Sequence, residues 1–187
     1  MMQGVNPPSV AAFQLAPTLP CAHHPTMKRS NELRPLSAEH HQALLVAFQL
    51  KKSLEGHPEA AGAPRELQGL VSLARRFDQQ VLTPHVRAEE EVLSPHLGAA
   101  DARRLASEHA ELRRLLEQAN QLSSDQRAAL GAFAELLERH VRWEERELFQ
   151  DAEARLDAAV LAGIGGELER RLVLAGNGSK GPKGARR

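Results

Sequence analysis

Histidine and glutamate recur in this sequence at a spacing that suits metal coordination. The segment HVRAEE, which begins at His85, returns as HVRWEE, which begins at His140. Residues four apart on an α-helix lie on the same face, one above the other, so His85 and Glu89 point the same way. His140 and Glu144 form a second pair of this kind. Each copy therefore offers one imidazole nitrogen and one carboxylate to a common point.

A second repeat supplies two more histidines. The segment LSAEH, which ends at His40, returns as LASEH, which ends at His109. This match favours His40 over its neighbour His41, because adjacent residues lie about 100° apart on a helix and cannot both face the interior. The order along the chain is EH, HxxxE, EH, HxxxE, which predicts two helical hairpins that carry the same chemistry.

Six candidate metal ligands follow from these repeats. They are His40, His85, Glu89, His109, His140 and Glu144. Helices that pack side by side can direct such residues to a shared point in the interior. Burying two carboxylates and four imidazoles without compensation is costly, and metal ions remove that cost. The burial expected for these residues is therefore itself an argument for bound metal.

The donor types limit the choice of metal. Imidazole and carboxylate without thiolate favour iron, manganese or zinc over copper(I), and the single cysteine, Cys21, excludes a thiolate cluster. If both glutamates bridge two ions, the six residues fill roughly eight of about twelve positions in two octahedra. The rest are left for water, an oxo or hydroxo bridge and an exogenous ligand. A closed structural zinc site would use four ligands and leave no open position.

Acidic and aromatic residues lie beside these candidate ligands in the sequence. We expect the glutamates beside the candidate ligands to face solvent, with hydrogen bonding to those ligands as the alternative. These are Glu39, Glu90, Glu108 and Glu145.

Trp143 either walls the metal cavity or packs in the core. Four phenylalanines are expected in the core: Phe48, Phe77, Phe133 and Phe149. His57 and His96 are expected at the surface. The absence of tyrosine removes the usual phenolate ligand or radical relay and disfavours an oxygenase or reductase.

Helical periodicity extends through most of the chain, and no segment alternates with a period of two. The expected helices cover 37–54, 64–93, 101–118, 126–156 and 158–174. Pro84 should distort the turn that precedes it. The segment 123–126 (SSDQ) offers a capping box to the fourth helix. The prediction is an all-α protein, a four-helix bundle with a short additional C-terminal helix.

Composition sets the limits of the domain and of its partners. We expect a disordered N-terminal segment at 1–33, the bundle at 34–175 and a disordered basic tail at 176–187. His23 and His24 lie beside Cys21 in the first segment, where a Pro-flanked chain offers little preorganisation for metal. The formal net charge of zero gives no argument for a nucleic-acid or membrane partner. No apolar run of about 18 residues and no signal peptide is evident, so a cytoplasmic location is expected.

With these motifs the chain resembles the hemerythrin-like (HHE) cation-binding domain, whose members hold a non-haem di-iron centre in a four-helix bundle. The EH, HxxxEE, EH, HxxxEE order carries the resemblance, which covers about 36–153. It implies two iron ions, with Glu89 and Glu144 as the bridging carboxylates and the four histidines named above as the other ligands.

The resemblance has two departures from the oxygen-carrying hemerythrins. Arg113 stands where they have a second histidine, one turn after the third-helix ligand, and Glu144 lies one residue closer to His140 than their fourth-helix carboxylate does. These departures favour sensing, peroxide or nitric-oxide chemistry, or iron handling, over reversible oxygen carriage.

The expected function is binding of iron and a small ligand (dioxygen, nitric oxide or peroxide) for sensing, storage or stress response, more as a binding protein than as an enzyme. The alternatives are a di-iron enzyme or iron-handling protein (ferrous iron oxidation, peroxide decomposition, repair of iron–sulfur clusters) and a zinc- or manganese-bound structural bundle. A protein partner does not follow from the sequence.

Overall fold

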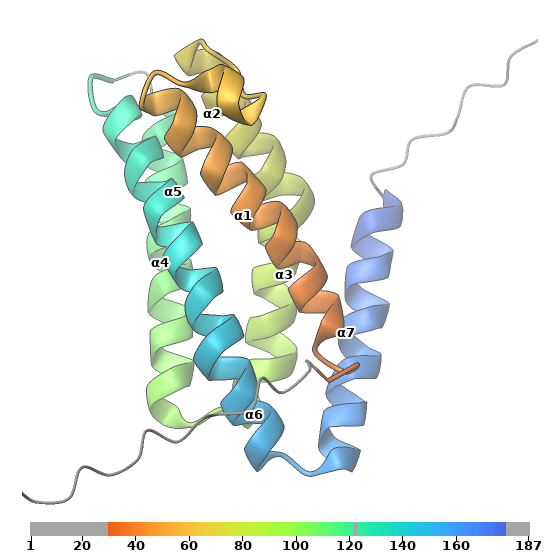
Figure 1. Cartoon of the computed structure of the whole chain (residues 1–187). Helices are drawn as coiled ribbons and strands as arrows, with labels where there is room; N and C mark the ends of the chain where they lie inside the picture. Colours follow the sequence, from red (N-terminus) through yellow and green to blue (C-terminus); the bar gives the residue numbers. More distant parts are fainter. Residues whose placement is uncertain (1–29, 122, 179–187) are drawn as a thin grey trace, which may run out of the picture.

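The structure is a computed structural model that describes residues 30–121 and 123–178. The all-α prediction is confirmed, since helices dominate these residues and no strand occurs among them (Figure 1). Cys21, His23 and His24 lie outside the described residues, as do most of the two segments expected to be disordered. None of the described helices combines the length and the apolar character required to cross a bilayer.

Two long stretches of the chain remain helical through several changes of helix type. The helices are α1 (Arg34–Leu54), α2 (Leu67–Phe77), α3 (Thr83–Ala88), α4 (Ala99–Asn120), α5 (Gln126–Trp143), α6 (Phe149–Arg155) and α7 (Ala158–Gly178). Turns of π-helix occur at Asp78–Leu82, Glu89–Leu93 and Glu144–Leu148, and 3₁₀ turns at Pro58–Ala61 and Ser94–His96. The stretches 67–96 and 126–155 are therefore each continuous helices that contain π turns.

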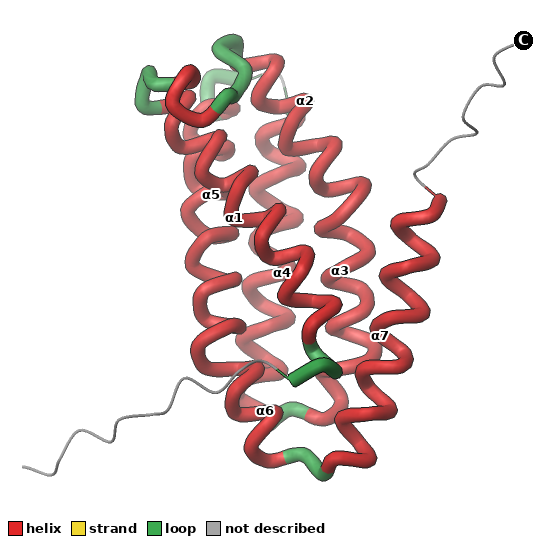
Figure 2. The backbone as a smooth tube through the Cα atoms, turned by 45° about the vertical axis from the view of Figure 1, so that its right-hand side comes forward, coloured by secondary structure: helices red, strands yellow, loops and turns green. Residues whose placement is uncertain are grey.

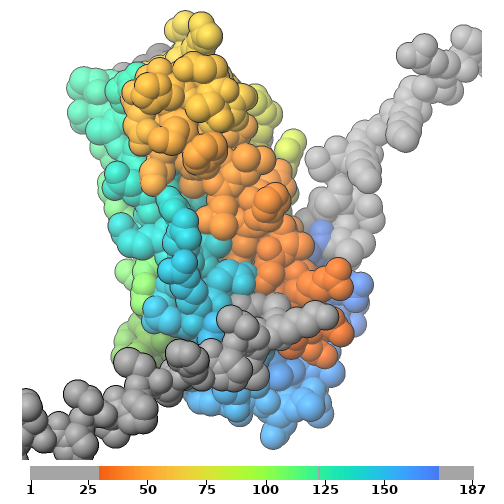
Figure 3. Space-filling model, in the orientation of Figure 1, coloured from red at the N-terminus to blue at the C-terminus, as the bar shows by residue number. Residues whose placement is uncertain are grey.

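The helices α1, α3, α4 and α5, which we call the site helices, run side by side in the cartoon and in the tube view (Figures 1 and 2). Helix α5 packs against α1 on one side and α4 on the other. In the space-filling view, the orange α1 and the cyan α5 form one closed surface, so side chains fill the space between their ribbons (Figure 3). Helix α7 packs outside the site helices, against α1 and α3. It was expected to be short, but at 21 residues it equals α1 in length.

Two hydrophobic clusters lie on either side of a layer of buried polar residues. The upper cluster includes Leu50 and Phe133, and the lower cluster includes Leu36 and Leu148. Burying one such large side chain contributes about 1.5–3 kcal/mol relative to leaving it exposed. Along α1, the lower cluster ends at Leu36, then comes the polar His40, and the upper cluster begins at the next turn. The polar layer therefore interrupts an otherwise apolar interior.

The distortion expected before Pro84 takes the form of a π turn. The N–H of Thr83 donates to the carbonyl of Asp78, five residues earlier, and its side chain also donates to the Asp78 carboxylate at 2.9 Å. Proline has no N–H to donate and its ring crowds the preceding turn, so a widened turn lets the helix continue. The helix that contains Pro84 begins at Leu67, later than expected from Pro64.

The predicted capping box of α5 is wrong. Its N-cap residue is Asp125, which makes no capping hydrogen bond through its side chain. Gln126 is instead buried, and its amide nitrogen donates to the carbonyl of Ala119 at 2.8 Å while its oxygen accepts from Gln68 at 3.1 Å. A buried amide needs such partners, and they join the end of α4 to the start of α5.

Two further expectations about burial need correction. Phe48 is 44% exposed on α1, whereas Phe77, Phe133 and Phe149 are buried as predicted. Leu33, which was assigned to the disordered N-terminal segment, is fully buried in the lower cluster. Both outcomes depend on which neighbouring helix covers a given face, and a helical period alone does not specify that.

Candidate metal centre

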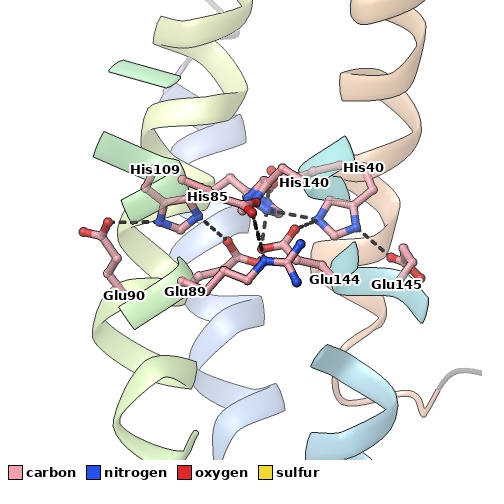
Figure 4. Close-up of polar contacts among 11 residues, drawn as sticks. His40, His85, Glu89, Glu90, His109, His140, Glu144 and Glu145 are labelled. Atoms are coloured by element: carbon pink, nitrogen blue, oxygen red, sulfur yellow. Dashed lines mark hydrogen bonds and ion pairs between the residues drawn. The ribbon is translucent and has the colours of Figure 1, made fainter. Parts of the chain in front are cut away.

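The structure brings all six candidate ligands together in the polar layer. Each of these residues is at most 5% exposed. His40 comes from α1, His85 from α3, His109 from α4 and His140 from α5, and the two glutamates begin the π turns that follow α3 and α5. The close-up shows the imidazoles and the two carboxylates directed toward one another (Figure 4). His41, the competitor of His40, is exposed as predicted, and so are His57 and His96.

The ligand atoms form two groups that overlap. Each group contains two histidines and two glutamates, and all ligand atoms within a group lie within 4.8 Å of one another. One group is His40, His85, Glu89 and Glu144, and the other is Glu89, His109, His140 and Glu144. Both glutamates therefore belong to both groups. Each group has the donor number and the spacing that could hold a metal ion.

Most of the atoms that face the centre lack hydrogen-bond partners, and the exceptions are the Nε2 atoms of His40 and His85, which lie 3.2 Å apart. All four carboxylate oxygens of Glu89 and Glu144 are buried without one, and so are the Nε2 atoms of His109 and His140. These groups do approach each other, for example at 3.1 Å between His140 Nε2 and Glu144 Oε1, but without hydrogen-bond geometry. Leaving a buried polar group unsatisfied costs about 1–3 kcal/mol, and more for a charged group. A cation at the centre would satisfy all of these atoms, so the residues present fit a metal.

The outer nitrogen of every candidate ligand histidine donates to a carboxylate. The Nδ1 to Oε distances are 2.6 Å for His40–Glu145, 2.9 Å for His85–Glu39, 3.0 Å for His109–Glu90 and 2.8 Å for His140–Glu108. Because a carboxylate can only accept, each Nδ1 carries a proton, and a neutral ring would then present the lone pair of its Nε2 to a metal. The expectation that these four glutamates mainly face solvent is therefore wrong, and the alternative is correct. Their position next to the ligands in both repeats was the available signal.

Electrostatics in the absence of metal favour charged side chains at this layer. Burial alone would lower the pKa of His140, but the Glu144 carboxylate and the hydrogen bond to Glu108 outweigh it and raise that pKa to about 10. Burial would also lower the pKa of His85, but the Glu89 carboxylate outweighs burial and raises that pKa well above its usual value. Burial would raise the pKa of Glu89, but His85 and His109 hold it well below the ordinary range. Metal binding must therefore displace protons from the imidazoles.

Two aromatic rings border the centre from the lower cluster. The ring of Phe149 stacks on that of His40, with centroids 5.4 Å apart and planes 10° apart. Trp143 is 5% exposed and packs in the lower cluster, with its ring centroid 6.2 Å from that of His140. Of the two roles considered for Trp143, core packing is confirmed. The proximity of Phe149 to the centre was not foreseen, because it depends on contact between α1 and the start of α6.

A small apolar cavity adjoins the centre on the side of the upper cluster. Its volume is about 10 Å³, which is room for roughly one water-sized molecule. His40, His85 and His140 line one side of it, and apolar residues such as Ala43 and Leu137 line the other. Arg113 does not reach this cavity. It is 49% exposed on α4 and donates to Glu90 at 3.3 Å.

Comparison with known proteins places the chain in one family. No curated protein and no solved structure matches it. The sequence model of the family described as "Hemerythrin HHE cation binding domain" matches residues 31–152, well over half of the chain. The match contains all six candidate ligands and all four outer carboxylates. The chain therefore belongs to the hemerythrin HHE cation-binding domain family, a family of metal-binding domains.

Proposed function

We propose that the site helices form the four-helix bundle of this family around a non-haem di-iron centre. Glu89 and Glu144 would be shared by the two irons, with His40 and His85 holding one iron and His109 and His140 holding the other. The observation that carries this proposal is the pair of overlapping ligand groups, which share both glutamates. Two separate single-ion sites would have no reason to share them.

The donor set supports iron over a closed structural metal. Imidazole and carboxylate oxygen suit iron, manganese and zinc, and no thiolate lies among the described residues of the centre. Six protein ligands around two ions leave coordination positions open. Bound iron would supply redox chemistry and a place for an exogenous ligand at those positions.

The cavity supports a small ligand. The cavity beside His40 and His85 has room for roughly one water-sized molecule, so it favours a very small ligand, and an organic substrate would need rearrangement of the upper cluster. Apart from Glu39 and the three histidines, the residues that line it are apolar. We therefore infer that the protein takes up dioxygen, nitric oxide or peroxide, for sensing, storage or stress response.

The outer carboxylates prepare the ligands for this role. By holding Nδ1 protons, Glu39 and Glu108 keep the Nε2 atoms of His85 and His140 directed inward before any metal arrives. Because each ligand is already oriented, little side-chain entropy is lost on metal binding.

The proposal is tested by measuring the metal content and the visible spectrum of protein that is purified anaerobically and then exposed to air. We expect about two irons per chain, and His85→Ala should lower that content sharply. His41→Ala is the matched control, because it removes an exposed histidine and should leave the iron content unchanged. Zinc alone, or equal metal loss from both variants, would contradict the proposal. Catalytic turnover of peroxide or ferrous iron, in place of stable uptake of a small ligand, would assign the protein to the enzyme class instead.

A further inference from the structure

Each residue of one half of the centre has a counterpart in the other half. The LxxEH repeats relate Glu39 to Glu108, and the HVRxEE repeats relate His85 to His140. The contacts follow the same relation, because Glu39 accepts from His85 at 2.9 Å and Glu108 accepts from His140 at 2.8 Å. The centre is thus nearly symmetric in its ligands and in these outer carboxylates.

The symmetry ends at the residues that contact these outer carboxylates. Arg104 donates from Nε to the second oxygen of Glu108 at 2.9 Å, one helical turn along α4. The residue at the matching position before Glu39 is Pro35, which carries no charge. Within the described part of the chain, His85 is the only basic residue in ion-pair contact with Glu39.

Arg104 is held in place by a second contact. Its guanidinium carbon lies 4.0 Å from the centroid of the Trp143 ring, a cation–π arrangement. Trp143 is 5% exposed and is itself packed beside His140, whereas its counterpart in the other repeat is Ala88. Although Arg104 is 44% exposed, it therefore has a fixed position between a buried ring and a carboxylate.

We propose that Arg104 makes the two metal positions unequal, so that the His40/His85 position binds metal more tightly and fills first. This inference rests on the proposed two-metal centre. Arg104 shares the negative charge of Glu108, which makes Glu108 a weaker partner for His140 and His140 a weaker metal ligand. Its positive charge also acts directly against a cation on that side, in a partly buried environment where screening is reduced. Arg104 is thus a positioning and tuning residue, and it does not touch the metal.

The first experiment compares stepwise metal binding in single-charge variants. Co²⁺ alone is titrated into metal-free protein and followed by calorimetry and by visible absorption. In Arg104→Gln, the ratio of the two binding constants should shrink about tenfold relative to wild type, because the weaker position improves. Repulsion between the two bound ions also makes the two binding constants differ in every variant. The contribution of Arg104 is therefore measured by comparing the variants with wild type. Arg103→Gln is the matched control, since it removes the same charge from an exposed neighbour on α4.

The second experiment isolates each position. His109→Ala leaves the His40/His85 position complete, and His40→Ala leaves the His109/His140 position complete. We expect Co²⁺ to bind the His109→Ala protein more tightly than the His40→Ala protein. Adding Arg104→Gln should strengthen binding in the His40→Ala background about tenfold and change little in the His109→Ala background. Arg104→Lys keeps the charge and should resemble wild type, and a Lys variant that behaves like Arg104→Gln would overturn the role assigned to this charge.

The outcomes separate this inference from the proposed function. Fewer than two Co²⁺ ions per wild-type chain would overturn the two-metal centre itself. Two ions whose binding constants respond equally to Arg104→Gln and Arg103→Gln would leave the centre intact and overturn the role of Arg104. Thermal unfolding of each metal-free variant shows whether it is folded, and the single-charge comparison does not depend on the alanine variants.

Discussion

The Nδ1 atom of His109 on α4 lies 3.0 Å from Oε1 of Glu90, in the π turn that follows α3. A candidate ligand of the second hairpin is thus held by a carboxylate of the first. The reverse bond exists as well, because His40 on α1 donates to Glu145 at 2.6 Å. The two hairpins are joined through the groups that orient the centre, so metal affinity and hairpin docking should depend on one another.

Removing one of these outer carboxylates should weaken the metal centre without removing a ligand. We expect Glu90→Ala to lower metal affinity by about 10–100-fold, because His109 loses the acceptor that fixes its orientation. Competition with a chelator measures the change. Glu147→Ala, an exposed change in the π turn that contains Glu145, is the control. Unchanged affinity in Glu90→Ala would mean that the bond does not orient His109.

The two shared glutamates should behave differently from the histidines. Because Glu89 belongs to both ligand groups, Glu89→Ala should reduce metal content below one ion per chain. His109 belongs to one group only, so His109→Ala should retain about one ion. Elemental analysis of the two proteins, prepared side by side, gives the comparison. Similar metal contents in both variants would argue against shared, bridging carboxylates.

The metal-free protein should lose stability as pH rises above neutrality. The folded pKa of His140 is raised to about 10, above its value in the unfolded chain, because of Glu144 and Glu108 despite the opposing effect of burial. The resulting stabilisation is fully present below about pH 6.5 and is lost as pH rises through the folded value. We therefore expect the unfolding temperature of metal-free protein to fall between pH 7 and pH 10. In His140→Gln the dependence should be weaker, and a profile as steep as that of wild type would contradict this assignment.

Filling the small cavity should slow ligand uptake while leaving the metal in place. Ala43→Val adds two methyl groups to a wall of this 10 Å³ space, so nitric-oxide binding to the ferrous protein should become slower or weaker. Ala47→Val makes the same change one turn along α1, at a buried residue that does not line the cavity. Iron content should match wild type in both. Equal effects of the two variants on nitric-oxide binding would show that the ligand does not use this cavity.

Stability measurements should distinguish two phenylalanines that the sequence assigned to the same role. Phe133 is fully buried, and Phe133→Ala should cost about 3–5 kcal/mol of unfolding free energy. Phe48 is 44% exposed, so Phe48→Ala should cost under about 1 kcal/mol. Denaturant unfolding at a fixed metal load measures both. A large loss in Phe48→Ala would indicate that another surface covers it.

The sequence by itself determined the helical class and the residues that gather at the centre. The His–Glu pairs are four residues apart on one helix, and that geometry is local, so no tertiary information is needed to place both side chains on one face. The repeat then selected His40 over His41, and the structure buries the first and exposes the second. The hydrophobic period predicted the helices nearly to their ends for the same local reason.

Only the tertiary structure decided which groups meet across helices. The bond between His40 and Glu145 joins residues 105 apart in the chain, and the contact between Arg104 and Trp143 joins α4 to α5. Helical periodicity states which way a side chain points from its own axis, but not which helix lies opposite. The same limit explains why Phe48, at a core-like spacing, is exposed. Local spacing specified the ligands, whereas the packing of separate helices specified the carboxylates that orient them.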